Sequence, residues 1–368
     1  MKERQAVVAA WNEARRSGEE AVLATVVRIQ GSTYRRPGAR LLVLGDGRRI
    51  GSVSGGCLED EVARKAWWLT EGGPAVQRYS TLEDDDGARR FGSGCEGVVH
   101  ILIERLRPEA GDVPQLRLLE ACHRQRRAGA LVTVIDAGDT RARAGDRVLA
   151  GPDGEVERRC ADEAVADAMA AAAASALASG RSGEQTLDGV QVFVEHVAPP
   201  RSLVVFGAGF DAIPVVRMAV ELGWHVTVAD GRAHHARRDR FPLADEVAVI
   251  DAARPLERLA VPDGAACLLM THSADQDRAL LTALAPLPVA YLGVLGPRRR
   301  TEQLLRELPD LRFACTSGLH SPVGLDIGGE TPEEIALAAL AEIQASFARR
   351  DGRRLRDRAD GLIHTDSA

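Results

Sequence analysis

One stretch of this chain, VVFGAGFDAIPVVRMAVELGWHVTVADGR at 204–232, restricts its fold more than any other. An apolar run ends at Gly207, a helical pattern follows, and a second apolar run ends at Asp230. Gly207 suits a tight turn, Gly209 lets the backbone approach a phosphate at a helix N-terminus, and Ala212 suits helix packing. The stretch therefore predicts a strand–helix–strand unit of a parallel sheet.

The chain continues this alternation of strand and helix patterns toward its C-terminus. Further apolar runs at 246–250, 265–272 and 289–296 are separated by helical patterns. Such alternation is typical of a doubly wound parallel sheet. We expect a Rossmann-like domain over 203–348, followed by a charged tail at 349–368.

The predicted turn and strand ends carry the candidate ligand contacts of this domain. Asp230 follows Gly207 by 23 residues, where a carboxylate binds the ribose of NAD in such folds. Arg232 either offsets the charge of Asp211 or meets a 2′-phosphate. The alternative is a sheet whose crevice holds a different ligand or none. The candidate contacts are Gly207, Ala208, Gly209, Asp230, Arg232 and His272, which closes another predicted strand.

The first half of the chain has a less regular pattern. Apolar β-type runs such as 21–29 alternate with helical patterns, including one at 114–129 that we expect to stop at its glycine. These patterns predict one mixed α/β domain over 1–197. The proline-containing segment APPRS at 198–202 then serves as a linker to the second domain.

Three glycine-rich loops hold the candidate binding residues of this first domain: GSTYRRPGAR at 31–40, GSVSGGCLEDE at 51–61 and GSGCEGVV at 92–99. If the loops converge, their thiols, backbone N–H groups and arginines suit a large anionic ligand with soft metal or sulfur chemistry. The alternative is that each cysteine is a small buried apolar side chain. The candidates are Arg35, Arg36, Ser54, Gly55, Gly56, Cys57 and Cys95, and the two cysteines are also the candidate metal ligands.

Composition limits the class of protein and its surroundings. The 368 residues carry a net charge of −6 with acids interspersed among arginines, which argues against a nucleic-acid-binding protein. Six scattered cysteines without a CxxC pair, and no secretory signal, favour a reducing cytoplasm. No stretch approaches the ~18 apolar residues of a membrane span. We therefore expect a cytoplasmic protein that binds neither nucleic acid nor membrane.

The motifs together resemble the XdhC/CoxI family. Its N-terminal signatures are matched by GSTYRRPGARLLV, GSVSGGCLEDEV and GSGCEGVVHILIE. Its C-terminal Rossmann domain is matched by VVFGAGFDAIPV, VTVADGR, MTHSADQDRALL, YLGVLGPRRR and LHSPVGLDIGGETPEEIALAALAEI. These matches follow the family's order through about Ser346, which makes them more specific together than singly.

The resemblance implies a maturation factor for molybdenum hydroxylases such as xanthine dehydrogenase and aerobic carbon monoxide dehydrogenase. Such a protein binds the molybdenum cofactor, assists its sulfuration and delivers it to the apoenzyme, with a cysteine desulfurase as a further partner. The resemblance implies that Cys57 and Cys95 touch the molybdenum centre or carry its sulfur. It also implies that the glycines at 55–56 let the backbone approach the pterin and that the arginines at 35–36 meet its phosphate.

Two other functions stay open at this point. An NAD(P)-dependent oxidoreductase would bind NAD(P) or another nucleotide in the Rossmann-like domain and use Cys57 or His272 on its substrate. The tyrosines at 34, 79 and 291 form no Tyr-x-x-x-Lys pair for hydride transfer, which counts against it. A binding-only protein with a vestigial nucleotide site is the third function. The resemblance favours a cofactor-binding chaperone over a catalyst, and a homodimer is compatible with it.

Overall fold

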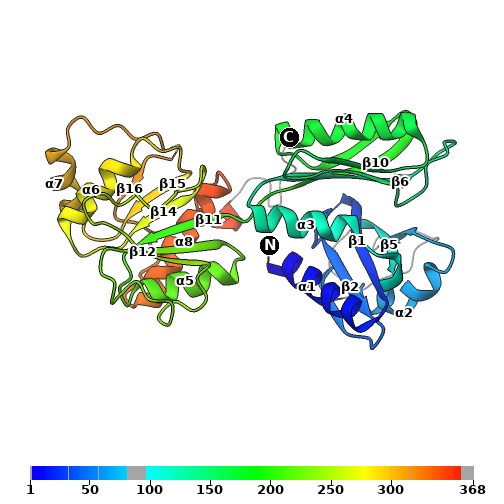
Figure 1. The fold of residues 1–368 in the computed structure, drawn as a ribbon, viewed down its shortest axis with the longest axis horizontal. Helices are drawn as coiled ribbons and strands as arrows, with labels where there is room; N and C mark the ends of the chain where they lie inside the picture. Colours follow the sequence, from blue (N-terminus) through cyan, green and yellow to red (C-terminus); the bar gives the residue numbers. More distant parts are fainter. Residues whose placement is uncertain (1, 32, 57, 81–96, 316, 358–368) are drawn as a thin grey trace. The chain divides into compact units, whose positions relative to one another are not determined.

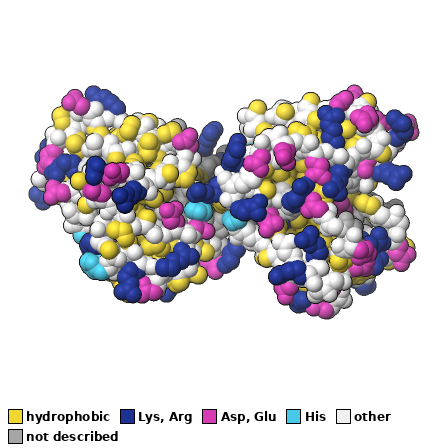
Figure 2. All heavy atoms as spheres, in the orientation of Figure 1, with side chains coloured by type: hydrophobic (Ala, Val, Ile, Leu, Met, Phe, Trp, Pro, Cys, Tyr) yellow, Lys and Arg dark blue, Asp and Glu magenta, His cyan; other side chains and the backbone are white. Residues whose placement is uncertain are grey.

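The computed structural model describes residues 2–31, 33–56, 58–80, 97–315 and 317–357. The chain divides into two compact units, Met1–Pro199 and Pro200–Ala368 (Figure 1). Among the residues described, no helix is both long and apolar enough to cross a membrane. Basic and acidic side chains are interspersed over the face drawn in Figure 2.

The N-terminal unit contains two antiparallel sheets. The first has the strand order β3-β2-β1-β5-β4. The second has the order β8-β7-β6-β10-β9. The strands are β1 (Ala21–Gly31), β2 (Arg40–Leu44), β3 (Arg49–Gly51), β4 (Ala75–Ser80), β5 (Gly97–Leu106), β6 (Gly129–Asp136), β7 (Arg147–Ala150), β8 (Val156–Arg159), β9 (Gly183–Leu187) and β10 (Val190–Val197).

Helices cover the faces of these two sheets in layers. Side chains of α1 and α3 share one core with residues from both sheets. The other face of the first sheet packs with α2, and the other face of the second sheet packs with α4. The helices of this unit are α1 (Lys2–Ser17), α2 (Glu59–Leu69), a 3₁₀ turn at Pro108–Ala110, α3 (Pro114–Gln125) and α4 (Glu163–Ser179).

The predicted end of α3 is wrong. The helix stops at Gln125 because Arg126 adopts a left-handed conformation with φ 54°. Gly129, which we expected to end the helix, is instead the first residue of β6. A side chain at Gly129 would lie 2.6 Å from the Cys122 sulfur, so the glycine allows the close approach of helix and strand.

Two buried ion-pair clusters join the sheets of the N-terminal unit. Arg40 of β2 binds the Glu195 carboxylate of β10, with Nη2–Oε2 at 2.5 Å and Nη1–Oε1 at 3.0 Å. Arg147 of β7 binds Glu104 of β5, which also accepts a 3.2 Å hydrogen bond from Gln115. In each cluster, one partner belongs to the first sheet and the other to the second.

The C-terminal unit contains one six-stranded parallel sheet, as the sequence predicts. Its strand order is β13-β12-β11-β14-β15-β16, with β11 at the centre. From β11 the chain adds β12 and β13 on one side of the sheet and then β14, β15 and β16 on the other. The strand order therefore reverses between β11 and β14, and this position is the topological switch point. The strands are β11 (Ser202–Phe206), β12 (His225–Asp230), β13 (Glu246–Val249), β14 (Ala266–Leu269), β15 (Tyr291–Val294) and β16 (Leu319–His320).

Helices lie on both faces of this sheet (Figure 1), α5 with α8 and α6 with α7. The buried core combines side chains of the strands with those of α6 and α7, such as Leu281 and Leu304. Thr331 and Glu334 form a capping box at the start of α8. The helices of this unit are α5 (Ala212–Glu221), α6 (Ala274–Leu284), α7 (Arg298–Glu307), α8 (Pro332–Phe347) and a 3₁₀ turn at Leu355–Asp357.

Candidate functional site

The described parts of two glycine-rich loops, 33–39 and 52–56, lie at one end of the first sheet of the N-terminal unit. β1 ends at Gly31, which pairs with Gly97, the first residue of β5. β2 begins at Arg40. Its antiparallel partner β3 ends at Gly51, which pairs with Leu41, the second residue of β2. Because these strands are antiparallel, the segments at 33–39 and 52–56 leave the sheet at the same end as Gly31 and Gly97.

Glu3 of α1 forms hydrogen bonds with both of these segments, 33–39 and 52–56. Its carboxylate accepts hydrogen bonds from Arg35 Nη2 at 2.5 Å and from the backbone N–H of Ser52 at 2.9 Å. Next to this link, the ring of Tyr34 lies against Gly55, so that a Cβ on the glycine would be 3.5 Å from the ring. The Tyr34 side chain is 67% exposed. The structure thus brings together Arg35 and the turn at 52–56.

The Glu59 carboxylate fills the inside of that turn. It accepts hydrogen bonds from the backbone N–H groups of Val53, Ser54 and Gly56 at 2.8–3.0 Å and from the hydroxyls of Ser52 and Ser54 at 2.6–2.7 Å. Burial alone would raise the pKa of Glu59. The hydrogen bonds from Ser54 and Ser52 outweigh burial and lower the pKa from 4.5 to about 2. The turn therefore already holds an anion of its own.

The remaining N-terminal candidates differ in what the structure shows of them. Cys57 and Cys95 lie outside the described residues. Arg36 is exposed, and a Cβ on Gly56, which has φ +117°, would face open space. The four other cysteines lie in or against packed cores, as expected, and burial raises the pKa of the Cys122 thiol to about 11.

The turn after β11 packs tightly against the end of β14. Gly207 has φ +115°, and a Cβ there would lie 2.5 Å from the Met270 carbonyl oxygen. Any other residue would therefore be strained and would separate the two strands. Pro214 lies in the first turn of α5, where it removes no helical hydrogen bond.

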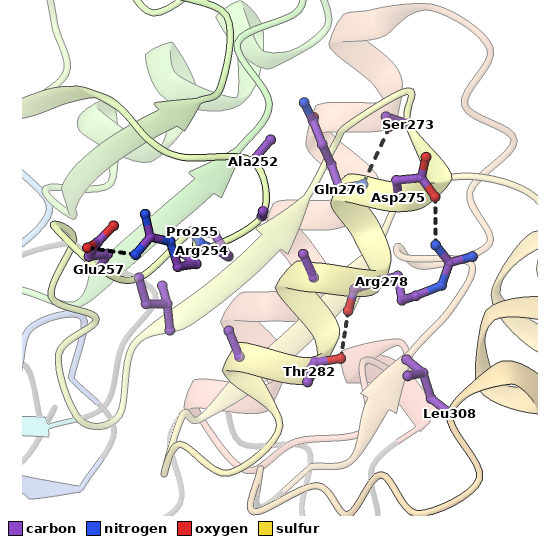
Figure 3. Close-up of a pocket in the computed structure, with 14 residues that line it drawn as sticks. Ala252, Arg254, Pro255, Glu257, Ser273, Asp275, Gln276, Arg278, Thr282 and Leu308 are labelled. Atoms are coloured by element: carbon purple, nitrogen blue, oxygen red, sulfur yellow. Dashed lines mark hydrogen bonds and ion pairs between the residues drawn. The ribbon is translucent and has the colours of Figure 1, made fainter.

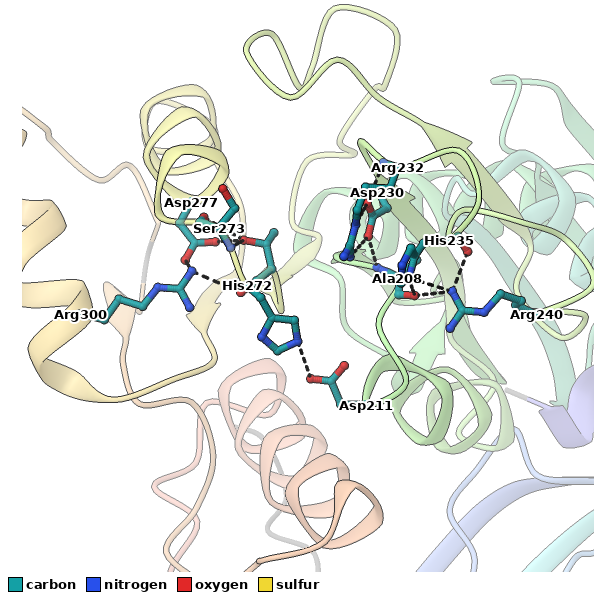
Figure 4. A network of polar contacts seen from close by, with 11 residues as sticks. Ala208, Asp211, Asp230, Arg232, His235, Arg240, His272, Ser273, Asp277 and Arg300 are labelled. Atoms are coloured by element: carbon teal, nitrogen blue, oxygen red, sulfur yellow. Dashed lines mark hydrogen bonds and ion pairs between the residues drawn. The ribbon is translucent and has the colours of Figure 1, made fainter.

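Asp230 is nearly buried and its carboxylate is fully engaged within the protein (Figure 4). It accepts hydrogen bonds from Ala208 N at 2.7 Å and from the backbone N and guanidinium of Arg232 at 2.8–3.0 Å. Burial opposes ionisation, but the hydrogen bonds from Arg232 and Ala208 lower the pKa of Asp230 to about 2. The Asp230 carboxylate thus binds the glycine turn and Arg232, and its contact with a ribose stays a prediction.

His272 and Asp211 face each other across the switch point (Figure 4). His272 Nε2 lies 4.0 Å from Asp211 Oδ2. A Cβ on Gly209 would collide with the Asp211 carboxylate. The place where a pyrophosphate approaches Gly209 in dinucleotide-binding folds is therefore covered by a negative charge.

A second ion pair lies behind His272. Asp277 of α6 accepts a hydrogen bond from Thr271 Oγ1 and pairs with Arg300 Nη2 at 2.5 Å. Arg300 also donates to the Thr271 carbonyl at 3.3 Å. Burial raises the pKa of Asp277 despite these two partners. The pair fixes the segment that carries His272 against α7.

A groove lies beside this edge of the sheet, between the segment at 252–257 and α6 (Figure 3). Its volume is about 820 Å³, which is within the range of small-molecule sites. Its lining is largely apolar, while the charged groups at its rim pair with each other, as Arg254 does with Glu257. The carboxyl edge of a doubly wound sheet is where such folds bind ligands.

Sequence reasoning did not include several of these polar residues among the site candidates. Glu59 was visible only as an acid in the first turn of a helix, although serines at 52 and 54 upstream could have pointed to its role. Asp211 was expected to have its charge offset by Arg232, but its carboxylate lies next to His272, 61 residues further along the chain. Within the described residues, no group of three His, Cys, Asp or Glu side chains is placed to hold a metal ion.

The fold defines a two-unit α/β protein whose C-terminal unit has the parallel sheet of a Rossmann domain. Comparison with family models identifies it further. Residues 14–80 match the model of the XdhC and CoxI family, and residues 203–343 match the XdhC Rossmann domain. The chain belongs to the XdhC and CoxI family, which confirms the resemblance seen in its motifs.

Individual relatives match along most of the chain. A Bacillus subtilis protein, named as a probable subunit of xanthine dehydrogenase, is 31% identical over 88% of this chain and 92% of its own. The molybdenum cofactor insertion chaperone PaoD of Escherichia coli is 26% identical over 90% of this chain and 85% of its own. A crystal structure of a Bacillus halodurans protein named as a xanthine dehydrogenase has a TM-score of 0.74 at 25% identity, covering 97% and 99% of the two chains.

Proposed function

We propose that this protein binds molybdenum cofactor as cargo, assists its sulfuration and delivers it to the apoenzyme of a molybdenum hydroxylase. The observation that carries the proposal is the match to PaoD along 90% of the chain, within a family that also includes the Bacillus subtilis relative. The hydroxylase is of the xanthine dehydrogenase or carbon monoxide dehydrogenase type, and a cysteine desulfurase supplies the sulfur.

The converging N-terminal loops are the cargo site in this proposal. The exposed ring of Tyr34 offers a flat face for stacking of a pterin ring, beside the open backbone at Gly56. Arg35 and Arg36 lie on the same loop and suit the phosphate of the cargo. Ser54 and Gly55 shape the turn, while its N–H groups at 53, 54 and 56 already bind Glu59.

Cys57 and Cys95 are the two thiols of the proposal. A thiolate is a soft ligand that suits molybdenum–sulfur chemistry and can carry a sulfur atom as a persulfide. We assign these two cysteines, and not the packed ones, because burial raises the pKa of the thiols of Cys122, Cys160 and Cys267 and makes them poor nucleophiles.

The alternative of an NAD(P)-dependent oxidoreductase has less support. Its nucleotide would need the Asp230 carboxylate, which binds Ala208 and Arg232, and the space over Gly209, which the Asp211 carboxylate covers. The groove beside α6 leaves room for a nucleotide of another kind. A protein that only carries the molybdenum cofactor needs no residues for hydride transfer.

The test is the cofactor content of the purified protein. The protein is co-expressed with the molybdenum cofactor pathway and purified without oxygen, and pterin fluorescence and molybdenum are measured. We expect near-stoichiometric pterin in the wild type and in Cys160→Ala, the control cysteine, and at least a roughly tenfold loss in Cys57→Ala and Cys95→Ala. Absence of pterin under conditions that load PaoD would refute the carrier function. Full loading of both variants would refute the assignment of the thiols.

A further inference from the structure

One oxygen of the Asp211 carboxylate is left without a hydrogen-bond donor among the residues described, while the other lies 4.0 Å from His272 Nε2. The Oδ1 atom of Asp211 is buried and has no hydrogen-bond partner within the described part of the chain. Asp211 precedes the first residue of α5, yet its side chain makes no capping hydrogen bond. A buried carboxylate oxygen without a donor is costly, because it has lost its water and gained nothing in exchange.

The arginines around this edge of the sheet are already bound elsewhere. Arg232 pairs with Asp230 at 2.8 Å, and Arg300 pairs with Asp277 at 2.5 Å. Arg240 donates to the Ala208 carbonyl at 2.8 Å and lies 3.1 Å from His235 Nδ1. None of these pairings involves Asp211, and His272 is the side chain that lies at ion-pair distance from its carboxylate.

His272 supplies a second donor atom next to this carboxylate. Its Nε2 is 4.0 Å from Asp211 Oδ2, and the side chain is 70% exposed. Zinc-type ions bind imidazole nitrogen and carboxylate oxygen at roughly 2.0–2.2 Å, so two donors on one ion lie at most about 4.2 Å apart. Gly209 makes room for both groups, since a Cβ there would collide with the carboxylate and lie 3.8 Å from Nε2.

We propose that Asp211 and His272 bind one divalent first-row metal ion, of the manganese or zinc class, at the switch point of the C-terminal sheet. One carboxylate oxygen and one imidazole nitrogen suit such ions, and water completes their coordination where the protein gives few ligands. The bound ion neutralises the carboxylate over Gly209 and presents a positive charge at the carboxyl edge. This site is independent of the cargo site in the N-terminal unit.

Titration with Mn²⁺ tests the proposal, with the free ion followed by its electron paramagnetic resonance signal. The whole chain is compared with Asp211→Asn, His272→Gln and, as a matched control, His234→Gln, an exposed histidine of the same unit. We expect Asp211→Asn and His272→Gln each to lose one equivalent of bound Mn²⁺ relative to the wild type, and the control to lose none. Retention of that equivalent in either variant would overturn the proposal.

Thermal unfolding separates loss of the site from loss of the fold. Without metal, Asp211→Asn should melt at or above the wild-type temperature, because the substitution removes the charge of a carboxylate whose Oδ1 atom has no donor in the described part of the chain. Added Mn²⁺ should raise the melting temperature of the wild type and of His234→Gln but not of the two site variants. An equal rise in all four proteins would count against the site.

Discussion

The Glu59 carboxylate accepts five hydrogen bonds from the turn that precedes it, three from backbone N–H groups and two from serine hydroxyls. The side chain is only 9% exposed. Charge-assisted bonds of this kind are stronger than neutral ones, and unpaired N–H groups would remain if the carboxylate were lost. Glu59 therefore fixes the shape of the turn that carries Ser54, Gly55 and Gly56.

Replacement of Glu59 by glutamine should lower the free energy of unfolding by about 2 kcal/mol at neutral pH. Because the folded-state pKa of about 2 lies below the ordinary value of 4.5, the stabilisation is complete above the ordinary value. It is lost as the pH falls from there through about 2. Urea unfolding of both proteins at a series of pH values measures this difference.

Asp60→Asn is the control for this prediction, since Asp60 is the next residue and its side chain is 81% exposed. It should change the unfolding free energy little at any pH. A difference between wild type and Glu59→Gln that stayed constant from pH 5 to pH 2 would contradict the role of the ionised carboxylate.

At the scale of single residues, the sequence predicts which positions need an unusual backbone conformation or carry a charge at a strand end. It predicts less well which atoms those residues contact. The glycine at 207 has the positive φ and the close approach that its motif requires. By contrast, the spacing that predicts a ligand contact for Asp230 does not predict its hydrogen bonds with Ala208 and Arg232. The choice between a ligand and a neighbouring donor depends on atomic positions that residue spacing does not contain.

At the scale of elements, the two buried ion pairs act as links between the sheets of the N-terminal unit. Removal of one partner leaves the other charge buried without compensation, so Glu195→Ala should cost about 4 kcal/mol of stability. The double variant Arg40→Met with Glu195→Leu should recover most of that loss, because no deeply buried charge then remains unpaired: Arg4, which also contacts Glu195, is 35% exposed. Urea unfolding of the three proteins measures both effects.

The exposed pair of Asp46 and Arg48 provides the matched control, since its side chains are 47% and 58% exposed. Asp46→Ala should leave the unfolding midpoint unchanged. If Glu195→Ala were as mild as this control, or if the double variant were as unstable as the single one, the ion pair would not link the sheets as described.

The sequence predicts long amphipathic and buried elements well and short edge strands poorly. The parallel strands of the C-terminal unit are recognisable as continuous apolar runs between helical patterns. β8 and β9 escaped notice because they are short, mostly exposed edge strands without apolar alternation. The division of the N-terminal strands into two antiparallel sheets depends on pairings such as β1 with β5, which join residues far apart in the chain.

At the scale of the whole molecule, each unit has its own buried core. One core cluster of the C-terminal unit consists of side chains from residues 204–319, and buried side chains of α8 such as Leu340 and Ile343 also belong to this unit. We therefore expect residues 200–368, expressed separately, to fold and to unfold cooperatively. Far-ultraviolet circular dichroism and a thermal melt measure this, and the melting temperature should match one transition of the full chain.

The matching experiment uses residues 1–199, whose cores draw on both antiparallel sheets. A C-terminal fragment that stayed unfolded while the full chain melted in a single transition would show that the two units depend on each other for stability. That outcome would replace the domain limits predicted near 198–202.

The turn filled by Glu59 has a consequence for which anions can enter it. The carboxylate is attached to the chain a few residues away, so its effective concentration at the turn is on the order of millimolar or higher. A freely diffusing anion must compete with this tethered one, and dilute phosphate or carboxylate loses that competition. A ligand that displaces this carboxylate from the turn therefore needs additional contacts elsewhere.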